Sequence, residues 1–562
     1  MQQTCRNLWC KQPFEVTEDD LAFYDQISPI FEEKKYAIPP PTLCPDCRQQ
    51  RRLAWRNERN LYNRDCDLCK KHIISVYPAL SPFPVYCLNC WWGDQWSAES
   101  FGKPYDPTKR FLDQWEELHR TVPKLAIQND NGIESENSEY SYDISRCKNC
   151  YRLIGSWYDQ DCHYSLNVNQ SKDVVDCNTV SIRSELVYES LDSQHLYHSA
   201  YLQNCENCTD CLFGYDLKGC ADCFACFDLR QKRFCIFNEQ HTEESYRKKM
   251  QSFNPGSQRA VQDIRKKFDT WILRFPRLFA NLQNCEDCEG NNLFNCKAVL
   301  GYSVFSSEYS KFIDRSDRPI HCYDIINTGG PQWCCDCVTP DDSYMTHFSV
   351  WCWKSKNILL SDNCHSSEHL LGCISMHRSK YCILNKQYSK REYESLAGTI
   401  IESLKKEEAW GEHLPICLSP FGYNESAASE YYPLPKEETL RHGWHWSDTL
   451  PYTTGKETVR WDHIADDIAD VPDTIVHEVF SCQTCQKNFK IIAQELAFYR
   501  KMPCPLPRQC PNCRHLARFR RKTPTRLWSR NCDKCGKNFR TTYTPDRPEK
   551  IYCRECYLKE VY

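Results

Sequence analysis

The chain has 562 residues, 40 cysteines and a formal net charge of -4. A chain of that length is longer than a single hydrophobic core usually supports, so several domains are expected. The N-terminus lacks the apolar segment of a signal peptide, and no stretch approaches the roughly 20 apolar residues of a membrane span. These features argue against a secreted disulfide scaffold and a membrane protein. We therefore expect a cytoplasmic protein in which many cysteines bind metal.

The charge is distributed unevenly along the chain. Residues 481–562 contain 19 Lys and Arg against 6 Asp and Glu, a local balance of +13. The first 96 residues contain 12 of each kind, so residues 97–480 carry the remaining -17. A basic C-terminal segment indicates an anionic partner, and attraction to the acidic middle of the same chain is the alternative.

Sixteen cysteines form four sets with the spacing of zinc ribbons. In two sets, two CxxC pairs are separated by 17 residues: Cys66, Cys69, Cys87 and Cys90, and Cys532, Cys535, Cys553 and Cys556. The other two sets are Cys482, Cys485, Cys510 and Cys513, and the less regular Cys5, Cys10, Cys44 and Cys47. Four thiolates fill every position around Zn²⁺ at about 2.3 Å and leave no place for a catalytic water. The sequence thus predicts about four structural Zn²⁺ ions per chain.

The two ends of the chain read as copies of one tandem module. Phe14 corresponds to Phe489, and the motif LAFY occurs at both 21–24 and 496–499. In the N-terminal copy the first pair reads CxxxxC, so Cys5 is the least regular of the predicted ligands. The duplication nevertheless predicts two ribbons in series at each end.

Several long motifs carry a resemblance. CQTCQKNFKIIAQELAFYRKM with the later PRQCPNCR resembles the "probable zinc-ribbon" module of bacterial and plant proteins. The whole chain resembles an uncharacterised cysteine-rich family of candidate-phyla bacteria with zinc ribbons and a β-solenoid, through CPDCR, RNERNLYNRDCD, VYCLNCWW, ESENSEYS, SPFGYNES and IYCRECYLKEVY. This resemblance implies an architecture and no particular activity.

A cation-rich segment separates the paired ribbons at each end. With an offset of 466, Arg48, Arg52 and Arg56 correspond to Arg514, Arg518 and Lys522. A short helix would place each i,i+4 arginine pair on one face. Cations interleaved with aromatic rings suit phosphate contacts and base stacking. The candidate nucleic-acid contacts, to RNA before DNA, are Arg514, Arg518, Arg520, Arg521, Lys522, Arg526 and Trp528.

The arginines that both copies share have an alternative role, which is to neutralise the thiolates of the zinc sites. Arg520 and Arg521 stand opposite Ala54 and Trp55 in the N-terminal copy. Together with Lys522 they are the stronger candidates for an external anion.

The acidic middle has a repeat. Cysteines recur at a step of fifteen positions, as in Cys147, Cys162 and Cys177, then Cys205, Cys220 and Cys235, then Cys322, Cys337 and Cys352. A unit of this length suits one coil of a parallel β-solenoid, whose strands stack at about 4.8 Å. A second duplication, with an offset of 147, aligns CIFNEQHTEESY with CILNKQYSKREY. We expect a mainly β fold in which tandem zinc ribbons flank two solenoid lobes, each followed by a helix.

The middle cysteines have two interpretations. As one buried position per coil they would be small core side chains. Extra metal, at CENCTDC and CADCFAC, is the alternative.

These patterns predict eight segments along the chain. They are N-terminal tandem ribbons (1–96), a helical connector (97–135), solenoid lobe 1 (136–240), a helical insert (241–280), solenoid lobe 2 (281–387), a helix (388–410), an extended acidic arm (411–477) and C-terminal tandem ribbons (478–562).

Evidence for an enzyme is sparse in the sequence. The stretch CHSSEHLLGCISMH contains Cys364, His365, His369, Cys373 and His377, but a coil of fifteen positions would scatter them over different faces. The pair His195 and His198 is weaker still, and no phosphate-binding or nucleophile motif is present.

We expect a non-enzymatic zinc scaffold whose C-terminal module contacts nucleic acid. The alternatives are a protein–protein interaction scaffold with purely structural zinc and a carbohydrate-active β-helix enzyme.

Overall fold

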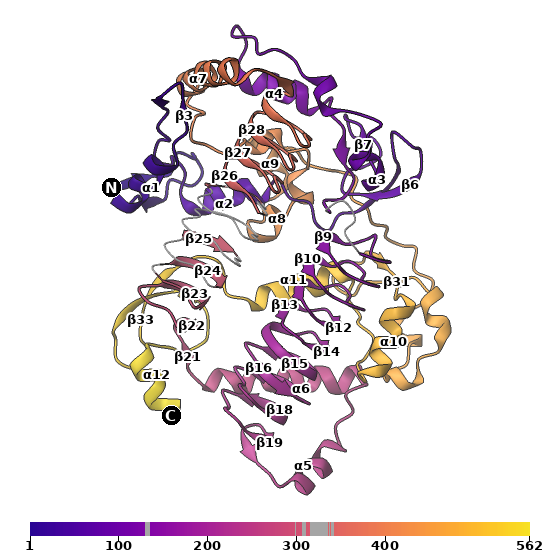
Figure 1. Ribbon diagram of the computed structural model, residues 1–562. Coiled ribbons are helices and arrows are strands. Elements are labelled where there is room, and N and C mark those ends of the chain that lie inside the picture. Colours follow the sequence, from indigo (N-terminus) through magenta and orange to yellow (C-terminus); the bar gives the residue numbers. More distant parts are fainter. Residues whose placement is uncertain are drawn as a thin grey trace.

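The computed structural model describes residues 1–129, 135–297, 299–305, 311–314, 335–336, 338 and 342–561. It is rich in strands, and each end of the chain carries cysteine clusters in a module of short hairpins and helices. In Figure 1 the two terminal modules lie around parallel strands contributed by the middle of the chain.

The N-terminal module holds two ribbons in series. The first comprises β1 (Gln2–Thr4), β2 (Pro13–Glu15), α1 (Glu18–Ile27), β3 (Ile30–Phe31), β4 (Lys34–Lys35) and α2 (Pro45–Leu53). The second comprises β5 (Tyr62–Asp65), β6 (His72–Ser75), β7 (Val85–Tyr86) and α3 (Leu88–Trp92). Strand β7 also pairs in parallel with β8 (Lys124–Leu125), which ties the module to the connector that follows.

The C-terminal module repeats this order of elements. It comprises β31 (Phe480–Ser481), β32 (Asn488–Phe489), α10 (Ala493–Lys501), α11 (Pro511–Arg521), β33 (Trp528–Asn531), β34 (Asn538–Thr541), β35 (Ile551–Tyr552) and α12 (Arg554–Val561). The starts of helices α2 and α11, and of hairpins β5–β6 and β33–β34, keep the offset that the duplicated sequence predicted. Both arginine segments are helical, and each begins with a proline in its first turn, where no backbone N–H is missed.

Between the modules, strands pair in parallel at a nearly regular chain separation, which in the first stack is twelve positions for most pairs and thirteen for two of them. Partners such as Ile154 and Leu166 are twelve positions apart. The strands are β9 (Tyr142–Ser145), β10 (Ile154–Trp157), β11 (Leu166–Asn169), β12 (Lys172–Val175), β13 (Asn178–Ser181), β14 (Glu185–Tyr188), β15 (Leu191–Gln203), β16 (Glu206–Thr209), β17 (Leu212–Tyr215), β18 (Ala221–Phe227) and β19 (Arg233–Ile236). We call residues 136–240 the first stack.

Every third side chain of the first stack is turned inward. Ile144, Cys147, Cys150 and Leu153, which are successive inward positions, belong to one buried cluster. The residue before an inward position has a positive φ, as at Asp143 (56°). The left-handed conformation is unfavourable for residues other than glycine, so other contacts must offset its cost at each of these positions.

Inward serine and cysteine side chains supply those contacts. Ser156 Oγ accepts the N–H of Val168 at 3.2 Å and donates to the carbonyl of Ile154 at 3.2 Å. Cys147 Sγ lies 3.5 Å from the carbonyl oxygens of Ser145 and Ser156. Serine and cysteine side chains therefore share the interior with aliphatic ones, because they satisfy backbone groups of neighbouring units that water cannot reach.

The second half of the middle segment has the same kind of pairing. A four-stranded parallel sheet contains β22 (Leu282–Gln283), β23 (Glu289–Phe294), β24 (Leu300–Phe305) and β25 (Lys311–Asp314). A second stack contains β26 (Tyr344–His347), β27 (Lys356–Leu359), β28 (Glu368–Leu371) and β29 (Lys380–Ile383), again with partners twelve positions apart. In the view of Figure 1 the first stack runs downward from β9 to β19, whereas β22 to β28 run upward.

Each stack ends in a cap of the same construction. Strand β20 (Glu239–Gln240) turns back antiparallel on β19, and β30 (Lys386–Gln387) does so on β29. Asn238 Oδ1 accepts the N–H of Phe227 at 2.8 Å, and Asn385 Oδ1 accepts that of Ile374 at 2.7 Å. The caps match the second duplication of the sequence and cover strand edges that would otherwise pair with other chains.

Helices connect the parts. They are α4 (Phe111–His119), α5 (Glu243–Met250), α6 (Gln258–Trp271) and α7 (Lys390–Lys406). Ser389 and Glu392 form a capping box at the start of α7, whose buried face includes Ile400, Ile401 and Leu404. The strand pair β21 (Arg277–Leu278) and β35 joins the segment after α6 to the C-terminal module.

The segment 411–477 differs from the extended arm that the sequence predicted. It contains α8 (Ala428–Tyr431), α9 (Lys436–Arg441) and several 3₁₀ turns. Ser419 Oγ donates to the carbonyl of Ala54 at 2.8 Å, and Gln50 Nε2 donates to Tyr423 Oη at 2.8 Å. The motif SPFGYNES therefore packs against the end of α2.

The predicted repeat length of fifteen positions is wrong for the described strands. Most successive units stack at a separation of twelve positions, with thirteen at two strand pairs of the first stack and eleven between β22, β23 and β24, and inward positions of the first stack recur at every third residue within a unit. Two cysteines fifteen positions apart are therefore separated by one unit of twelve positions and one further inward step of three, so both point inward. Cys322 and Cys337 of the predicted series lie outside the described residues.

Candidate metal centres and ligand cavities

The sixteen predicted ligands converge in four clusters. In each cluster the four Sγ atoms lie within 4.8 Å of one another: Cys5, Cys10, Cys44 and Cys47; Cys66, Cys69, Cys87 and Cys90; Cys482, Cys485, Cys510 and Cys513; Cys532, Cys535, Cys553 and Cys556. One Sγ–Sγ distance per cluster is 3.6, 3.8, 3.7 and 3.7 Å, in that order. A tetrahedron with Zn–S bonds of about 2.3 Å separates its sulfur atoms by about 3.8 Å. The clusters therefore have the dimensions that a tetrahedral thiolate-bound metal requires.

Cys5 occupies the same place in its cluster as the first cysteine of the other three. The backbone N–H of Cys44 donates to Cys5 Sγ at 3.4 Å. The equivalent bonds run from Cys87 to Cys66 at 3.2 Å, from Cys510 to Cys482 at 3.2 Å and from Cys553 to Cys532 at 3.3 Å. The irregular CxxxxC spacing thus preserves the geometry of a ribbon.

Backbone N–H groups favour the thiolate form of the first cysteine in the C-terminal clusters. Burial raises the pKa of Cys482, but the N–H groups of Cys510, Cys485 and Thr484 outweigh burial and bring that pKa to about 7. The same balance brings the pKa of Cys532 to about 6. Since the thiolate is the metal ligand, one cysteine of each C-terminal cluster is ready to bind a cation near neutral pH, whereas burial raises the pKa of Cys510 to about 11 and also raises that of Cys513.

The central cysteines have a different environment. Cys208 and Cys211, from CENCTDC, are buried, and each Sγ lies 3.3 Å from a backbone carbonyl two residues earlier. Among the residues that the structure describes, three or more metal-ligand atoms converge at the four terminal clusters. The described cysteines of residues 136–240, Cys208 and Cys211 among them, therefore pack in the core of the first stack.

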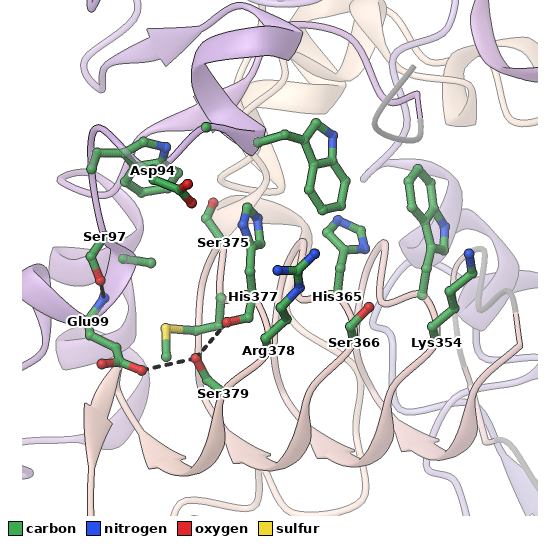
Figure 2. A pocket seen from close by; sticks show the side chains of 16 residues that line it. Asp94, Ser97, Glu99, Lys354, His365, Ser366, Ser375, His377, Arg378 and Ser379 are labelled. Carbon is green, nitrogen blue, oxygen red and sulfur yellow. Dashed lines mark hydrogen bonds between the residues drawn. The ribbon is translucent and has the colours of Figure 1, made fainter. Parts of the chain in front are cut away.

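His365 and His377 lie close together, contrary to the sequence prediction. Parallel bridges join Trp353 to His365 and His365 to His377, because each pair is separated by exactly one unit of the stack. The two imidazole centroids are 6.0 Å apart, and with Trp92 at the end of α3 the rings line a cavity of about 380 Å³ (Figure 2). The spacing 353, 365, 377 was the signal in the sequence, and the longer predicted unit concealed it.

The other residues of that stretch lie elsewhere. Cys364 and Cys373 are in the core of the second stack, and His369 stacks on Tyr381 with ring centroids 4.9 Å apart. The other predicted pair was His195 and His198, and His198 Nδ1 bonds Asp210 Oδ1 of the next unit on the surface of the first stack.

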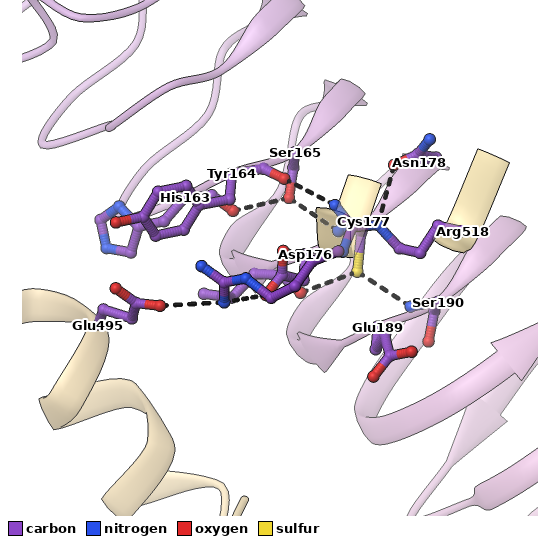
Figure 3. A network of polar contacts seen from close by, with 12 residues as sticks. His163, Tyr164, Ser165, Asp176, Cys177, Asn178, Glu189, Ser190, Glu495 and Arg518 are labelled. Carbon is purple, nitrogen blue, oxygen red and sulfur yellow. Dashed lines mark hydrogen bonds and ion pairs between the residues drawn. The ribbon is translucent and has the colours of Figure 1, made fainter. Parts of the chain in front are cut away.

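Arg514 and Arg518 are buried, so their predicted contact with nucleic acid is wrong. Arg514 Nη1 bonds Asp176 Oδ2 at 2.5 Å, and Arg518 Nη1 bonds Asp176 Oδ1 at 2.8 Å. The exposed fractions are 6% for Arg514, 1% for Arg518 and 0% for Asp176. Figure 3 shows Arg518 reaching Asp176 and Asn178, with Glu495 of α10 beside them. These arginines bind carboxylates of the chain itself, so they dock α11 onto the first stack.

The N-terminal copy makes the equivalent contact. Arg52, which corresponds to Arg518, forms a buried ion pair with Asp336, and Arg51 Nη2 lies 3.4 Å from the same carboxylate. Asp176 and Asp336 both have a positive φ, of 56° and 47°. Arg52 and Arg518, which occupy matching positions, thus each bind an aspartate of the middle segment, whereas Arg48, the counterpart of Arg514, donates from Nη1 to the carbonyl of Leu43.

Three other predicted nucleic-acid contacts are ion-paired. Arg521 lies 3.8 Å from Glu189, Lys522 lies 3.1 Å from Asp192, and Arg526 lies 3.2 Å from Asp46. Arg521 and Lys522 thus pair with the acidic middle, as the alternative interpretation of the charge distribution proposed, whereas Arg526 pairs with the N-terminal module. Arg520 is exposed and has no ion pair among the described residues.

A second cavity, of about 920 Å³, lies beside the end of α11. Its lining includes the cations of Arg520, Lys522, Arg526 and Arg547 and the rings of Tyr302, Tyr431, Tyr432, Phe519 and Trp528. The guanidinium of Arg526 lies 5.4 Å from the Trp528 ring centroid. We call this space the α11 cavity. It contains four of the seven residues predicted to contact nucleic acid.

Within the described residues, no helix combines the length and apolar character needed to span a bilayer. No protein-family model matches the chain, and no curated protein matches it. A solved candidate acetyltransferase from Desulfovibrio desulfuricans G20 aligns at 8% identity with a TM-score of 0.10. That alignment covers 49% of this chain and 81% of the solved chain, and at this score it carries no structural argument.

Proposed function

We propose that the chain is a zinc-stabilised binding scaffold whose α11 cavity holds a short single-stranded nucleic acid, RNA before DNA. The observation that carries this proposal is the convergence of five aromatic rings with four cations in one cavity of about 920 Å³. Rings accept stacked bases of any sequence, and cations contact the phosphates between them.

Zinc is the metal that the four clusters suit best. Four thiolates around one centre leave no open position, which is the arrangement of structural zinc sites. The short hairpins of the ribbons have little core of their own, so metal binding would supply much of their folding free energy. We also infer that the parallel units of the two stacks form two β-solenoid lobes, in line with the resemblance to the cysteine-rich zinc-ribbon and β-solenoid family.

The charges of the cavity limit how strongly a nucleic acid can bind. Asp46, Asp192 and Glu430 also line the cavity, and they pair with Arg526, Lys522 and Arg59. Among the described residues Arg520 is therefore the cation best able to bind a phosphate. Arg526 is 41% exposed and could exchange its partner for a phosphate. About two phosphate contacts predict a slope of roughly -1.4 for log affinity against log salt on a single strand. Stacking would then supply most of the affinity, at about 1–3 kcal/mol per base.

The polar lining favours RNA. Asn291 Nδ2 donates to Thr523 Oγ1 at 3.0 Å, and the lining residues Ser429 and Thr525 carry hydroxyl groups that donate to the Ser426 carbonyl and to Gln49 Oε1 and can still accept. Amide and hydroxyl groups can bond the ribose 2′-hydroxyl, which DNA lacks.

Fluorescence anisotropy with labelled oligo(U) RNA and oligo(dT) DNA tests the proposal on zinc-loaded full-length protein. Trp528→Ala should weaken binding by roughly 5- to 150-fold through lost stacking. Trp528→Tyr, which copies Tyr62 of the N-terminal module, should keep most of it. Arg520→Ala should reduce the salt slope by about 0.7. Lys537→Ala, a cation that is 62% exposed on the same module and does not line the cavity, is the matched control.

The proposal fails if neither RNA nor DNA is retained in a salt-sensitive way between about 50 and 200 mM salt. It also fails if Lys537→Ala weakens binding as much as Arg520→Ala does. Either result would favour the protein–protein interaction scaffold, in which the basic module serves only to dock onto the acidic middle.

A further inference from the structure

The cavity of about 380 Å³ in Figure 2 is separate from the α11 cavity. One wall comes from α3 and the segment after it, through Trp92, Asp94, Trp96 and Glu99. The opposite wall comes from the second stack, through Trp353, His365 and His377. This size is within the range of small-ligand sites.

The aromatic walls are built by two independent features of the sequence. Trp92 and Trp96 follow the Cys87 and Cys90 pair of the second metal cluster, which fixes α3. Trp353, His365 and His377 occupy equivalent positions of successive units of the second stack. Each wall is therefore held by a rigid element, and the cavity between them is pre-formed.

The charges around the cavity cancel. Asp94 and Glu99 contribute two negative charges, and Lys354 and Arg378 contribute two positive ones. Burial lowers the pKa of His377 to about 4 and that of His365 well below its usual range, so both imidazoles are neutral at physiological pH. The lining has no net charge to attract a phosphate or an ammonium ion.

The faces of the rings are largely covered by one another. Trp92 stacks on His377 at 4.7 Å with an interplanar angle of 22°, and Trp353 lies 4.6 Å from His365. A nucleobase needs an open ring face on which to stack. This cavity instead offers ring edges and side-chain hydroxyl groups.

The ring edges carry polar atoms without partners. Trp92 Nε1, Trp353 Nε1, His365 Nδ1 and His377 Nε2 have no hydrogen-bond partner in the part of the chain that the structure describes. His365 Nε2 bonds Asn363 Oδ1 at 2.8 Å, and because an amide oxygen accepts, the proton is on Nε2. His365 Nδ1 is thus an acceptor in need of a donor, whereas each indole N–H needs an acceptor.

We infer that this cavity binds a neutral saccharide unit. Hydroxyl groups both donate and accept, so a sugar can satisfy the indole N–H groups and the imidazole nitrogen together. Its apolar C–H groups can pack on the indole rings, and the exposed lining residues Ser366, Asp94 and Arg378 can bond the remaining hydroxyl groups. A quaternary ammonium ligand could make none of these hydrogen bonds. The inference does not depend on nucleic-acid binding, because the two cavities share no lining residue.

Saturation-transfer NMR and tryptophan fluorescence titration with zinc-loaded full-length protein test the inference. The probes are maltose, cellobiose, lactose and N,N′-diacetylchitobiose at millimolar concentration, with adenosine monophosphate and choline as charged comparators. At least one disaccharide should bind saturably, and neither charged comparator should compete. Asp94→Ala and Arg378→Ala should each weaken that binding by about tenfold through loss of a charged hydrogen bond.

Both of these side chains are exposed, so the fold should tolerate their removal. Lys386→Ala, an exposed cation of the cap that does not line the cavity, should leave affinity unchanged. The inference is wrong if none of the four disaccharides binds. It is also wrong if adenosine monophosphate binds at least as tightly, or if Lys386→Ala weakens binding as much as Asp94→Ala.

Discussion

Replacing Asp176 with asparagine should loosen α11 from the first stack. The Asp176 carboxylate is fully buried and accepts hydrogen bonds from Arg514 and Arg518, at 2.5 and 2.8 Å. Asparagine keeps the size of the side chain, but it removes the charge that holds two buried guanidinium groups. The perturbation is therefore electrostatic, with little change in packing.

The expected cost follows from what the two arginines retain. Arg514 keeps Glu495 at 3.0 Å and Tyr499 Oη at 2.8 Å, whereas Arg518 keeps Asn178 Oδ1 and the carbonyl of Tyr164, both at 3.2 Å. Removing one partner of a buried ion pair costs about 3–5 kcal/mol. Because both arginines keep other acceptors, we expect the lower end, about 3 kcal/mol.

Native-state hydrogen exchange measures this change where it occurs. A loss of about 3 kcal/mol in the opening free energy of α11 makes its protected amides exchange roughly 100-fold faster. Global denaturation is less suitable because a chain with several modules need not unfold in two states.

The matched control is Asp336→Asn in the other half of the chain. Asp336 binds Arg51 and Arg52 of α2, so this variant should accelerate exchange in α2 and leave α11 unchanged. The reasoning is refuted if Asp176→Asn leaves α11 exchange within about threefold of the parent, or if each variant affects both helices equally. The first result would mean that the ion pair contributes no net docking energy, which is the usual behaviour of ion pairs on protein surfaces.

Three further predictions concern the stacks and the metal clusters. Burial raises the pKa of Asp159 to about 8 from its ordinary 3.8, so the folded state retains a proton that the unfolded state loses, and stability falls as pH rises from about 4 to 8. Asp159→Asn removes this loss, and its melting temperature should exceed that of the parent by a margin that widens from acid to neutral pH. At the caps, Asn385 Nδ2 donates to the carbonyls of Ile374 and Ala98, whereas Asn238 Nδ2 donates to the carbonyl of Phe227 alone. Asn385→Ala should therefore destabilise its cap by about 1 kcal/mol more than Asn238→Ala does, measured by hydrogen exchange in β29 and β19. Chelation should release about four metal ions per chain and expose both terminal modules to limited proteolysis, while the first stack stays protected.

Each of these outcomes can fail in a defined way. A constant melting-temperature margin for Asp159→Asn across the pH range would mean that its carboxyl is not protonated in the folded state. Equal effects of the two cap variants would mean that the bond to Ala98 contributes nothing. Release of more than four metal ions would return the central cysteines to the role of ligands.

The metal clusters could be predicted from the sequence because their determinants are local. A CxxC turn and a returning hairpin bring four sulfurs together whatever surrounds them, and the duplicated module supplied a second copy for comparison. The same comparison assigned Cys5 despite its irregular spacing. The helices α2 and α11 also followed from a local signal, the i,i+4 spacing of their arginines.

The partners of the arginines could not be predicted because they lie far along the chain. Arg518 and Asp176 are separated by 342 residues, and Asp176 belongs to a unit whose length was misjudged. Cysteine alone could not give that length, because an inward cysteine can occupy any of several positions in one unit. Serines such as Ser343, Ser355 and Ser367 do repeat at every twelfth position, and they would have placed His365 above His377.

Ultraviolet cross-linking of zinc-loaded full-length protein to 4-thiouridine RNA, followed by mass spectrometry of the peptides, tests the central claim most directly. If the α11 cavity holds a single strand, the cross-links should fall on residues 516–528, at Phe519 and Trp528 above all. They should disappear in Trp528→Ala and persist in Lys537→Ala. An absence of cross-links, or cross-links spread over both terminal modules, would contradict a nucleic-acid site in this cavity.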